Sequence, residues 1–158
     1  MYPGFHYRQL VMELLGTMFL CMIGGCAVYA SNNSYASTSL MNISIAHGMV
    51  LFIMICVGGS VSGGQYNPAV TIPLMVYKEL PITKGLFYIL AQMTGSVLAG
   101  WFLQNALPNA NLSNKNYGTS PTLNERIKIF EGFIMEFIAT FSLVLAVFTG
   151  IRRKQCEV

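Results

Sequence analysis

The chain has 158 residues, of which 54% are hydrophobic and only 9% are charged, and its formal net charge is +3. A water-soluble domain of this length normally carries about 25% charged residues, so the composition excludes an ordinary soluble domain and indicates a protein surrounded by lipid. The basic residues are scattered rather than clustered, so we expect no nucleic-acid partner.

Four apolar stretches are long enough to cross about 30 Å of hydrocarbon at about 1.5 Å per residue. They cover residues 10–30, 41–59, 85–107 and 130–151, and the second and third contain no charged residue. The sequence therefore predicts an all-α membrane protein with four transmembrane helices in a single domain over residues 1–158. An outer loop is expected at 108–129.

The distribution of basic residues predicts the orientation of these spans. Most of them fall on one side of a four-span arrangement, namely Arg8, Lys78, Lys84, Arg152, Arg153 and Lys154. By the positive-inside rule, both ends of the chain then face the cytoplasm or its topological equivalent. Three Asn-x-Ser sequons begin near the predicted outer side, at Asn32, Asn42 and Asn111. Glycosylation there is a hypothesis only, because an Asn-rich chain also produces such sequons by chance.

Between the second and third spans lies an unusual segment, SVSGGQYNPAVTIPLMVY (60–77). Asn67 suits a helix N-cap and Pro68 suits the first helical position. The apolar run that follows reaches only about half a bilayer before Lys78 and Glu79. We interpret residues 60–77 as a re-entrant loop and half-helix, since irregular backbone at membrane depth needs protein or a wet cavity around it. The alternative is an interfacial helix, but this segment lacks the basic face that such a helix shows.

The first and last spans resemble each other. LVMELLGTMFLCM (10–22) aligns with FIMEFIATFSLVL (133–145), so that Glu13 matches Glu136 and Thr17 matches Thr140. Three spans separate the two starts, which predicts an inverted repeat of the kind found in transporters and channels. The 158 residues would then hold one complete repeat and the first element of a second one, and a second Asn-Pro turn would fall beyond them.

The polar residues of the spans each allow two interpretations. Asn67 caps the half-helix and can also donate a hydrogen bond into a narrow passage, where the positive end of the helix dipole repels cations. Glu13 and Glu136 are either a proton relay or, as we prefer, structural acceptors for backbone N–H groups of the irregular loop. His47 is either a core residue or a member of a selectivity filter.

These residues together resemble the N-terminal half of the aquaporin, or major intrinsic protein, family. The resemblance rests on MELLGT in the first span, SGGQYNPAVT (62–71) and YILAQMTGS in the third span, in that order. It implies a tetrameric channel with six spans and two re-entrant half-helices that meet at paired Asn-Pro-Ala turns. Asn67, Pro68 and Ala69 would form the first turn, Glu13 and Glu136 would support the loops, and His47 would belong to the outer filter, as in vacuolar-type or ammonia-permeable members.

Two features depart from that family pattern. Gln65 stands where the family commonly has His, and it is expected to support the loop as a neutral amide. Pro73 lies inside the half-helix, where we expect it to kink or widen the helix. The second half-helix and the filter arginine of the family have no counterpart in these residues.

We therefore expect an aquaporin-like channel for water or small neutral solutes such as ammonia or hydrogen peroxide, incomplete without a second half. The alternative is a non-conducting structural or regulatory subunit of a larger membrane assembly. The expected partners are the lipid bilayer and either identical copies or a chain that supplies the missing half; a longer gene product would explain the length equally well. No enzyme activity, metal site or cofactor is expected, because no nucleophile–base pair, metal-ligand cluster or phosphate-binding loop occurs.

Overall fold

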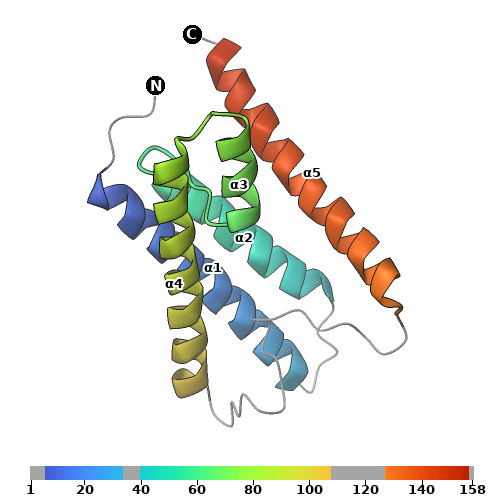
Figure 1. Ribbon diagram of the computed structural model, residues 1–158. Helices are drawn as coiled ribbons and strands as arrows, with labels where there is room; N and C mark the ends of the chain where they lie inside the picture. Colours follow the sequence, from blue (N-terminus) through green and yellow to red (C-terminus); the bar gives the residue numbers. More distant parts are fainter. Residues whose placement is uncertain (1–5, 34–39, 108–126, 157–158) are drawn as a thin grey trace.

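The computed structural model describes residues 6–33, 40–107 and 127–156, and all the regular secondary structure in these ranges is helical. These ranges form five helices, which are labelled in Figure 1. They are α1 (Tyr7–Asn33), α2 (Leu40–Gly58), the short α3 (Pro68–Val76), α4 (Ile82–Ala106) and α5 (Ile129–Cys156). All but α3 are long and apolar enough to cross a membrane. The predicted fold class, an all-α membrane protein with four membrane-length helices, is confirmed.

The four long helices lie where hydropathy predicted the spans, and most extend a few residues further. The span expected at 10–30 lies within α1, and the span expected at 130–151 lies within α5. The outer loop expected at 108–129 and the sequon at Asn111 fall mainly outside the described residues. Within the segment 60–77, only residues 68–76 are helical, and α3 continues through Pro73 to Val76.

The helices alternate in direction, so that the start of α1, the end of α2, the start of α4 and the end of α5 lie toward one end of the bundle (Figure 1). Helix α1 packs against both α2 and α4, and α3 lies against α4 and α5. Among the described helices, only α3 comes close to the backbone of α5. The half-helix therefore connects a three-helix unit to the last span.

Two small apolar clusters hold this arrangement together. One joins α3 to the start of α4 through Val70, Leu74, Leu80 and Tyr88, and the side chains of α5 packed beside it are Leu143, Val144, Val147 and Phe148. Met75 of α3 lies against Gly85 of α4, and Tyr88 of α4 packs with Val70 and Leu74 of α3. The other cluster joins α2 to the loop before α3 and contains Val50, Met54 and Tyr66.

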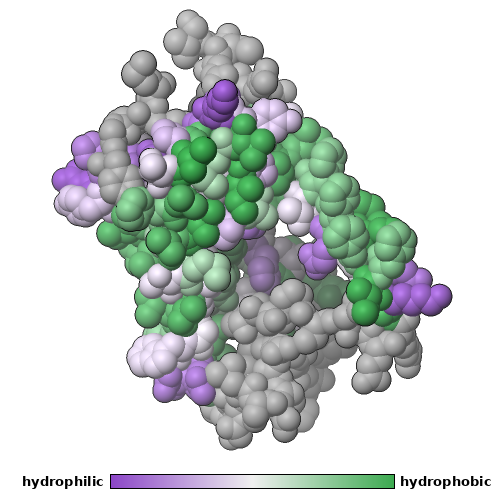
Figure 2. Space-filling model, in the orientation of Figure 1, coloured by the Kyte–Doolittle hydropathy of each residue, from purple (hydrophilic) through white to green (hydrophobic). Residues whose placement is uncertain are grey.

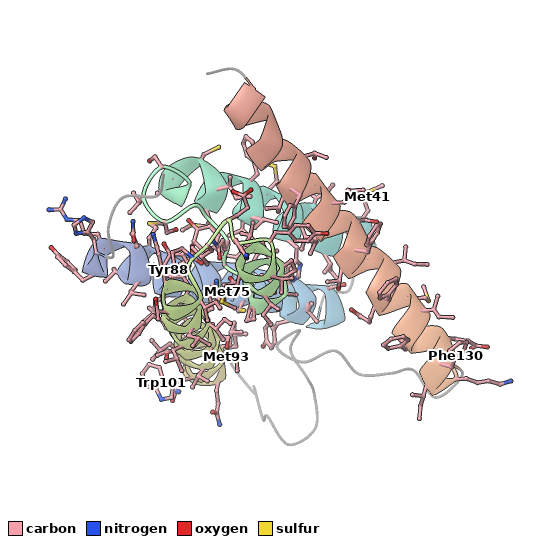
Figure 3. The ribbon with its side chains drawn as sticks, turned by 45° about the horizontal axis from the view of Figure 1, so that its top comes forward. Met41, Met75, Tyr88, Met93, Trp101 and Phe130 are labelled. Atoms are coloured by element: carbon pink, nitrogen blue, oxygen red, sulfur yellow. The ribbon has the colours of Figure 1, made fainter. Side chains whose placement is uncertain are left out.

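Most of the remaining apolar side chains are on the outside. The face in Figure 2 is largely hydrophobic over the helices, with hydrophilic surface toward their ends. Trp101 and Phe130 extend away from the bundle (Figure 3), and they are 63% and 71% exposed. Large apolar side chains on the surface of membrane-length helices fit contact with lipid or with other spans.

The polar residues of the interior, by contrast, lie along one face of α1 and the parts packed on it. Gln9, Glu13 and Thr17 follow each other at intervals of four residues, which places them on a single stripe of the helix. The other buried polar side chains come from the loop before α3, from Thr71 of α3 itself and from the facing side of α4. Glu13 and Thr17 of this stripe contact the loop that leads into the Asn-Pro-Ala turn.

Candidate functional site

The half-helix α3 begins at a residue pair that is well suited to start a helix. Asn67 has extended backbone (φ −153°, ψ 123°), and its Oδ1 accepts a hydrogen bond of 2.9 Å from the N–H of Ala69. Pro68 occupies the first helical position, where an N–H would have no intrahelical acceptor. The carbonyl of Asn67 accepts hydrogen bonds from the N–H groups of Val70 and Thr71. The side-chain Nδ2 of Asn67 finds no acceptor among the described residues, so the amide NH₂ group remains available as a donor at the turn.

The loop that leads into this turn requires left-handed backbone at three positions. Gly63 and Gly64 adopt φ values of 100° and 65°, which glycine reaches without steric cost. Tyr66 has a φ of 48°, which costs a residue with a Cβ about 1–2 kcal/mol. Such a conformation persists only where the surroundings impose it. The contacts of Tyr66 therefore determine how the turn is held.

All the backbone and side-chain polar atoms of Tyr66 bond to α1 or α2. Its N–H donates to Oε2 of Glu13 at 2.7 Å, and its carbonyl accepts at 3.2 Å from Oγ1 of Thr17, whose single O–H is shared with the Glu13 carbonyl at 2.8 Å. Its hydroxyl donates to the carbonyl of Met54 at 2.9 Å. The residue is only 1% exposed. Asn67 thus follows directly after a residue that is fixed at its N–H, its carbonyl and its ring.

The Tyr66 ring fits between two helices because both present glycine to it. A Cβ on Gly16 of α1 would collide with the ring, and a Cβ on Gly58 of α2 would collide with the hydroxyl. The missing side chains allow the ring to pass between α1 and α2 and reach Met54. These glycines therefore make room for the ring that fixes the loop.

Glu13 is the centre of the hydrogen-bond network beneath the turn. The residue is fully buried, and Oε1 accepts from the Ser62 hydroxyl at 2.6 Å and from the Gln65 N–H at 3.1 Å. Oε2 accepts from the Tyr66 N–H at 2.7 Å and from Nε2 of Gln92 at 2.8 Å. Four donors to one carboxylate favour the structural-acceptor interpretation of Glu13 over a proton relay, because no lone pair is left for a mobile proton.

Sequence reasoning missed the α4 side of this network. Gln92 also donates to Oγ1 of Thr71 at 3.0 Å, and Thr71 in turn donates to the carbonyl of Asn67 at 3.1 Å. The Tyr88 hydroxyl donates to the carbonyl of Ser62 at 2.9 Å. An amide in the middle of an uncharged span is the signal that could have identified Gln92, since such a group needs a partner in lipid.

Gln65 was predicted to support the loop through its side-chain amide, but in the structure its backbone N–H makes the supporting contact. The N–H of Gln65 donates to Glu13. Its side chain is 5% exposed, yet neither Oε1 nor Nε2 has a hydrogen-bond partner among the described residues. A buried amide without partners typically destabilises a protein by about 1–3 kcal/mol. The side chain is therefore available for hydrogen bonds that the described fold does not make.

The other two predicted residues lie away from the turn. His47 is half-buried on α2, where Nδ1 donates to the carbonyl of Ile43 at 2.9 Å and the Nε2 edge lies against Gly24 of α1. The neutral ring then has an acceptor at Nε2. Glu136 is exposed on α5 and has no hydrogen bond within the described part of the chain. Neither residue bonds to the loop 62–67, and their predicted filter and support roles stay predictions.

No group of three His, Cys, Asp or Glu side chains in the described ranges is arranged to hold a metal ion. A half-helix that begins inside a bundle of membrane-length helices, after an irregular loop fixed by a buried carboxylate, is characteristic of polytopic channels and transporters.

Comparison with known proteins identifies the family. The family model for the major intrinsic proteins matches residues 3–158. Nodulin-26 of Glycine max is 31% identical over 89% of this chain and 49% of its own length, and aquaporin TIP2-1 of Arabidopsis thaliana is 32% identical over 89% and 56%. Probable aquaporin NIP4-2 of Arabidopsis thaliana is 33% identical over 85% and 47%. The chain belongs to the major intrinsic protein family and is an integral membrane protein. It spans about half the length of the curated relatives it matches.

Proposed function

We propose that this chain forms one wall of a channel that passes water or a small neutral solute such as ammonia or hydrogen peroxide. The observation that carries the proposal is the unused Nδ2 donor of Asn67 at the start of α3. The cap and the hydrogen bonds of the first turn satisfy the other N–H groups there, and Pro68 has no N–H. A solute that carries an oxygen or nitrogen lone pair would accept from this amide.

The electrostatics of α3 support a neutral solute. The N-terminus of a helix carries about half a positive elementary charge, which repels cations, including hydrated protons. Glu13 lies close by, but it accepts four hydrogen bonds and is fully buried behind the loop. The passage would therefore meet the positive helix end and the Asn67 amide rather than the carboxylate.

The opposite wall would come from residues outside these 158, in a longer polypeptide or in another subunit. Glu136 supports this part of the proposal, because a charged residue at the centre of a span costs about 2.5–3.5 kcal/mol unless it faces a partner or water. It is exposed here and makes no hydrogen bond within the described residues. Assembly into oligomers, with tetramers as the family implies, belongs to the same proposal. So does the predicted orientation, with both ends of the chain on the cytoplasmic side.

The test is osmotic swelling of liposomes that carry the purified chain, measured by stopped-flow light scattering. Asn67→Asp keeps an oxygen that can cap Ala69 but removes the amide donor and adds negative charge, so it separates pore lining from capping. We expect the wild type to swell faster than empty liposomes and the Asn67→Asp variant to lose most of that increment. Asn105→Asp, in an exposed position at the end of α4, is the matched control and should conduct like the wild type.

Swelling that is unchanged in Asn67→Asp would refute the pore role of this amide. A wild-type rate equal to that of empty liposomes, also after co-reconstitution with the C-terminal half of a relative, would refute conduction. That second result would favour the alternative function, a non-conducting subunit of a larger membrane assembly.

A further inference from the structure

A buried glycine of α1 determines where the ring of His47 lies. A Cβ on Gly24 would collide with Nε2, Cδ2 and Cε1 of His47, so the tip of the imidazole ring lies directly against the backbone of α1. Any other residue at this position would fill that space. Gly48, the neighbour of His47 in α2, differs in this respect, because a Cβ there would meet open space.

Two contacts together fix the orientation of the ring. Nδ1 donates to the carbonyl of Ile43 at 2.9 Å, and the opposite edge lies against Gly24. Because Nδ1 carries the proton, Nε2 of the neutral ring has a free lone pair. Nε2 has no hydrogen-bond partner in the described part of the chain, and it is not one of the fully buried polar atoms. The half-buried ring therefore presents an acceptor that a small solute can reach.

Gly24 and His47 lie on the same faces of α1 and α2 that hold the re-entrant loop. Gly24 is seven residues after Thr17 and His47 is seven residues before Met54, and both Thr17 and Met54 bond to Tyr66. Seven residues are two helical turns, so each residue lies on the face of its partner and about 10 Å further along the helix. Because α1 and α2 run in opposite directions, both displacements point the same way (Figure 1). The imidazole therefore lies about two turns from the loop, on the same side of the bundle.

We propose that Gly24 is a positioning residue that sets solute specificity, because it lets Nε2 of His47 lie as an acceptor in line with the Asn67 amide donor. This inference rests on the proposed function and narrows its solute class. A solute that accepts from Asn67 and then donates to His47 needs both a lone pair and an O–H or N–H group. Ammonia has more N–H donors than lone pairs, whereas water has equal numbers of each. An acceptor in the passage therefore favours ammonia more than it favours water.

A methyl group at position 24 should move the ring rather than the helix. The ring is the end of a side chain that rotates about two bonds, and alanine is a better helix former than glycine. We therefore expect Gly24→Ala to fold, with the His47 ring turned away from α1 and its hydrogen bond to Ile43 lost. The displaced ring would then occupy the open side, where it narrows the passage.

The first measurement is nuclear magnetic resonance of isotope-labelled imidazole nitrogens in the purified chain, which does not depend on conduction. The chain contains two histidines, so His6→Gln assigns the His47 signals. We expect a protonated Nδ1 and an unprotonated Nε2 in the wild type and in Gly48→Ala, and altered signals in Gly24→Ala. Identical spectra of the wild type and Gly24→Ala would overturn the positioning role.

The second measurement is the permeability of liposomes to water and to ammonia, under the conditions in which the wild type conducts. Gly24→Ala should lower the water permeability several-fold and the ammonia permeability by a larger factor, whereas Gly48→Ala should leave both unchanged. In a His47→Ala background, Gly24→Ala should have no further effect, because no ring remains to be displaced. An equal loss in that background would show that Gly24 acts through helix packing and would overturn the proposal. A fall for ammonia no larger than that for water would overturn the role in specificity.

The outcomes separate this inference from the proposed function. If Asn67→Asp abolishes conduction and Gly24→Ala does not reduce it, the proposed function stands and the role of Gly24 is wrong. A wild type that conducts under no condition refutes the proposed function and the role of Gly24 in specificity together. The imidazole spectra then still decide whether Gly24 positions the ring.

Discussion

Two buried glutamines provide a matched test of how the re-entrant loop is held. Gln92 and Gln65 are 1% and 5% exposed, but only Gln92 uses its amide within the described fold. The change Gln92→Leu removes a hydrogen bond to the Glu13 carboxylate, worth about 1.5–3 kcal/mol, and one to Thr71, worth about 0.5–1.5 kcal/mol. After allowance for the apolar burial that leucine gains, we expect the free energy of unfolding to fall by about 2–4 kcal/mol.

Gln65→Leu should have a different effect. The variant loses no side-chain hydrogen bond within the described residues, and it removes a buried amide whose lack of partners costs about 1–3 kcal/mol. We therefore expect a free energy of unfolding that is equal to the wild-type value or higher. The backbone N–H that bonds to Glu13 is retained in the variant.

The assay is equilibrium unfolding of each variant in mixed micelles of mild detergent and sodium dodecyl sulfate, followed by circular dichroism. Losses of similar size in the two variants would refute the assignment, because they would mean that the Gln65 amide is hydrogen-bonded in the folded protein. A negligible loss for Gln92→Leu would show that the α4 side of the network contributes little to the loop.

Two smaller changes test the contacts of Tyr66 with α1 in the same assay. Gly16→Ala places a methyl group against the Tyr66 ring and should destabilise the fold by about 1–3 kcal/mol, as overpacking does. Gly48→Ala is the control, because its methyl group meets open space, and it should not destabilise the fold. Equal effects of the two changes would contradict the close packing of Tyr66. Thr17→Val removes a buried hydroxyl that is shared between the Glu13 carbonyl of its own helix and the Tyr66 carbonyl, and it should lower the free energy of unfolding by about 0.5–1.5 kcal/mol. The exposed Thr94→Val, whose hydroxyl bonds only within its own helix, should change it less.

The sequence was sufficient to predict the elements whose signals are local. Long apolar runs located the four spans, and the Asn67–Pro68 pair located the first residue of α3, because capping depends on neighbours in the chain. The contacts that hold the loop are not local. Gln92 and Glu13 are 79 residues apart, and their pairing follows from how α1 packs against α4. Periodicity gives the face of a helix that is polar, but it does not give the partner of that face.

The Tyr66 conformation shows a second limit of prediction. The motif SGGQYNPAVT indicates glycines that permit unusual backbone, and Gly63 and Gly64 adopt it. Nothing local indicates that tyrosine also has a positive φ, since that conformation is unfavourable for it. It becomes stable only through contacts with α1 and α2, which belong to the tertiary structure.

The two glutamates of the internal repeat show that equal sequence context does not produce equal surroundings. Both follow methionine in an apolar span, yet Glu13 accepts four hydrogen bonds and Glu136 accepts none in the described part of the chain. In Glu13→Gln, the new amide group faces two donors that lose their acceptor, at about 1–3 kcal/mol each, so we expect a total loss of about 2–6 kcal/mol. Glu136→Gln removes an exposed carboxylate and should change the free energy of unfolding of the 158-residue chain by less than about 0.5 kcal/mol.

Unfolding of both variants in the same micelles measures this difference. Equal losses would mean that α5 folds back onto the bundle and buries Glu136, which would contradict the arrangement in which α5 approaches only α3. If the second half of a relative is supplied, the proposed function predicts a further effect on stability. Glu136→Gln should then become destabilising as well, because the carboxylate would acquire N–H donors as Glu13 has done. A glutamate that matters only in the presence of the second half would locate the missing wall of the channel against α5.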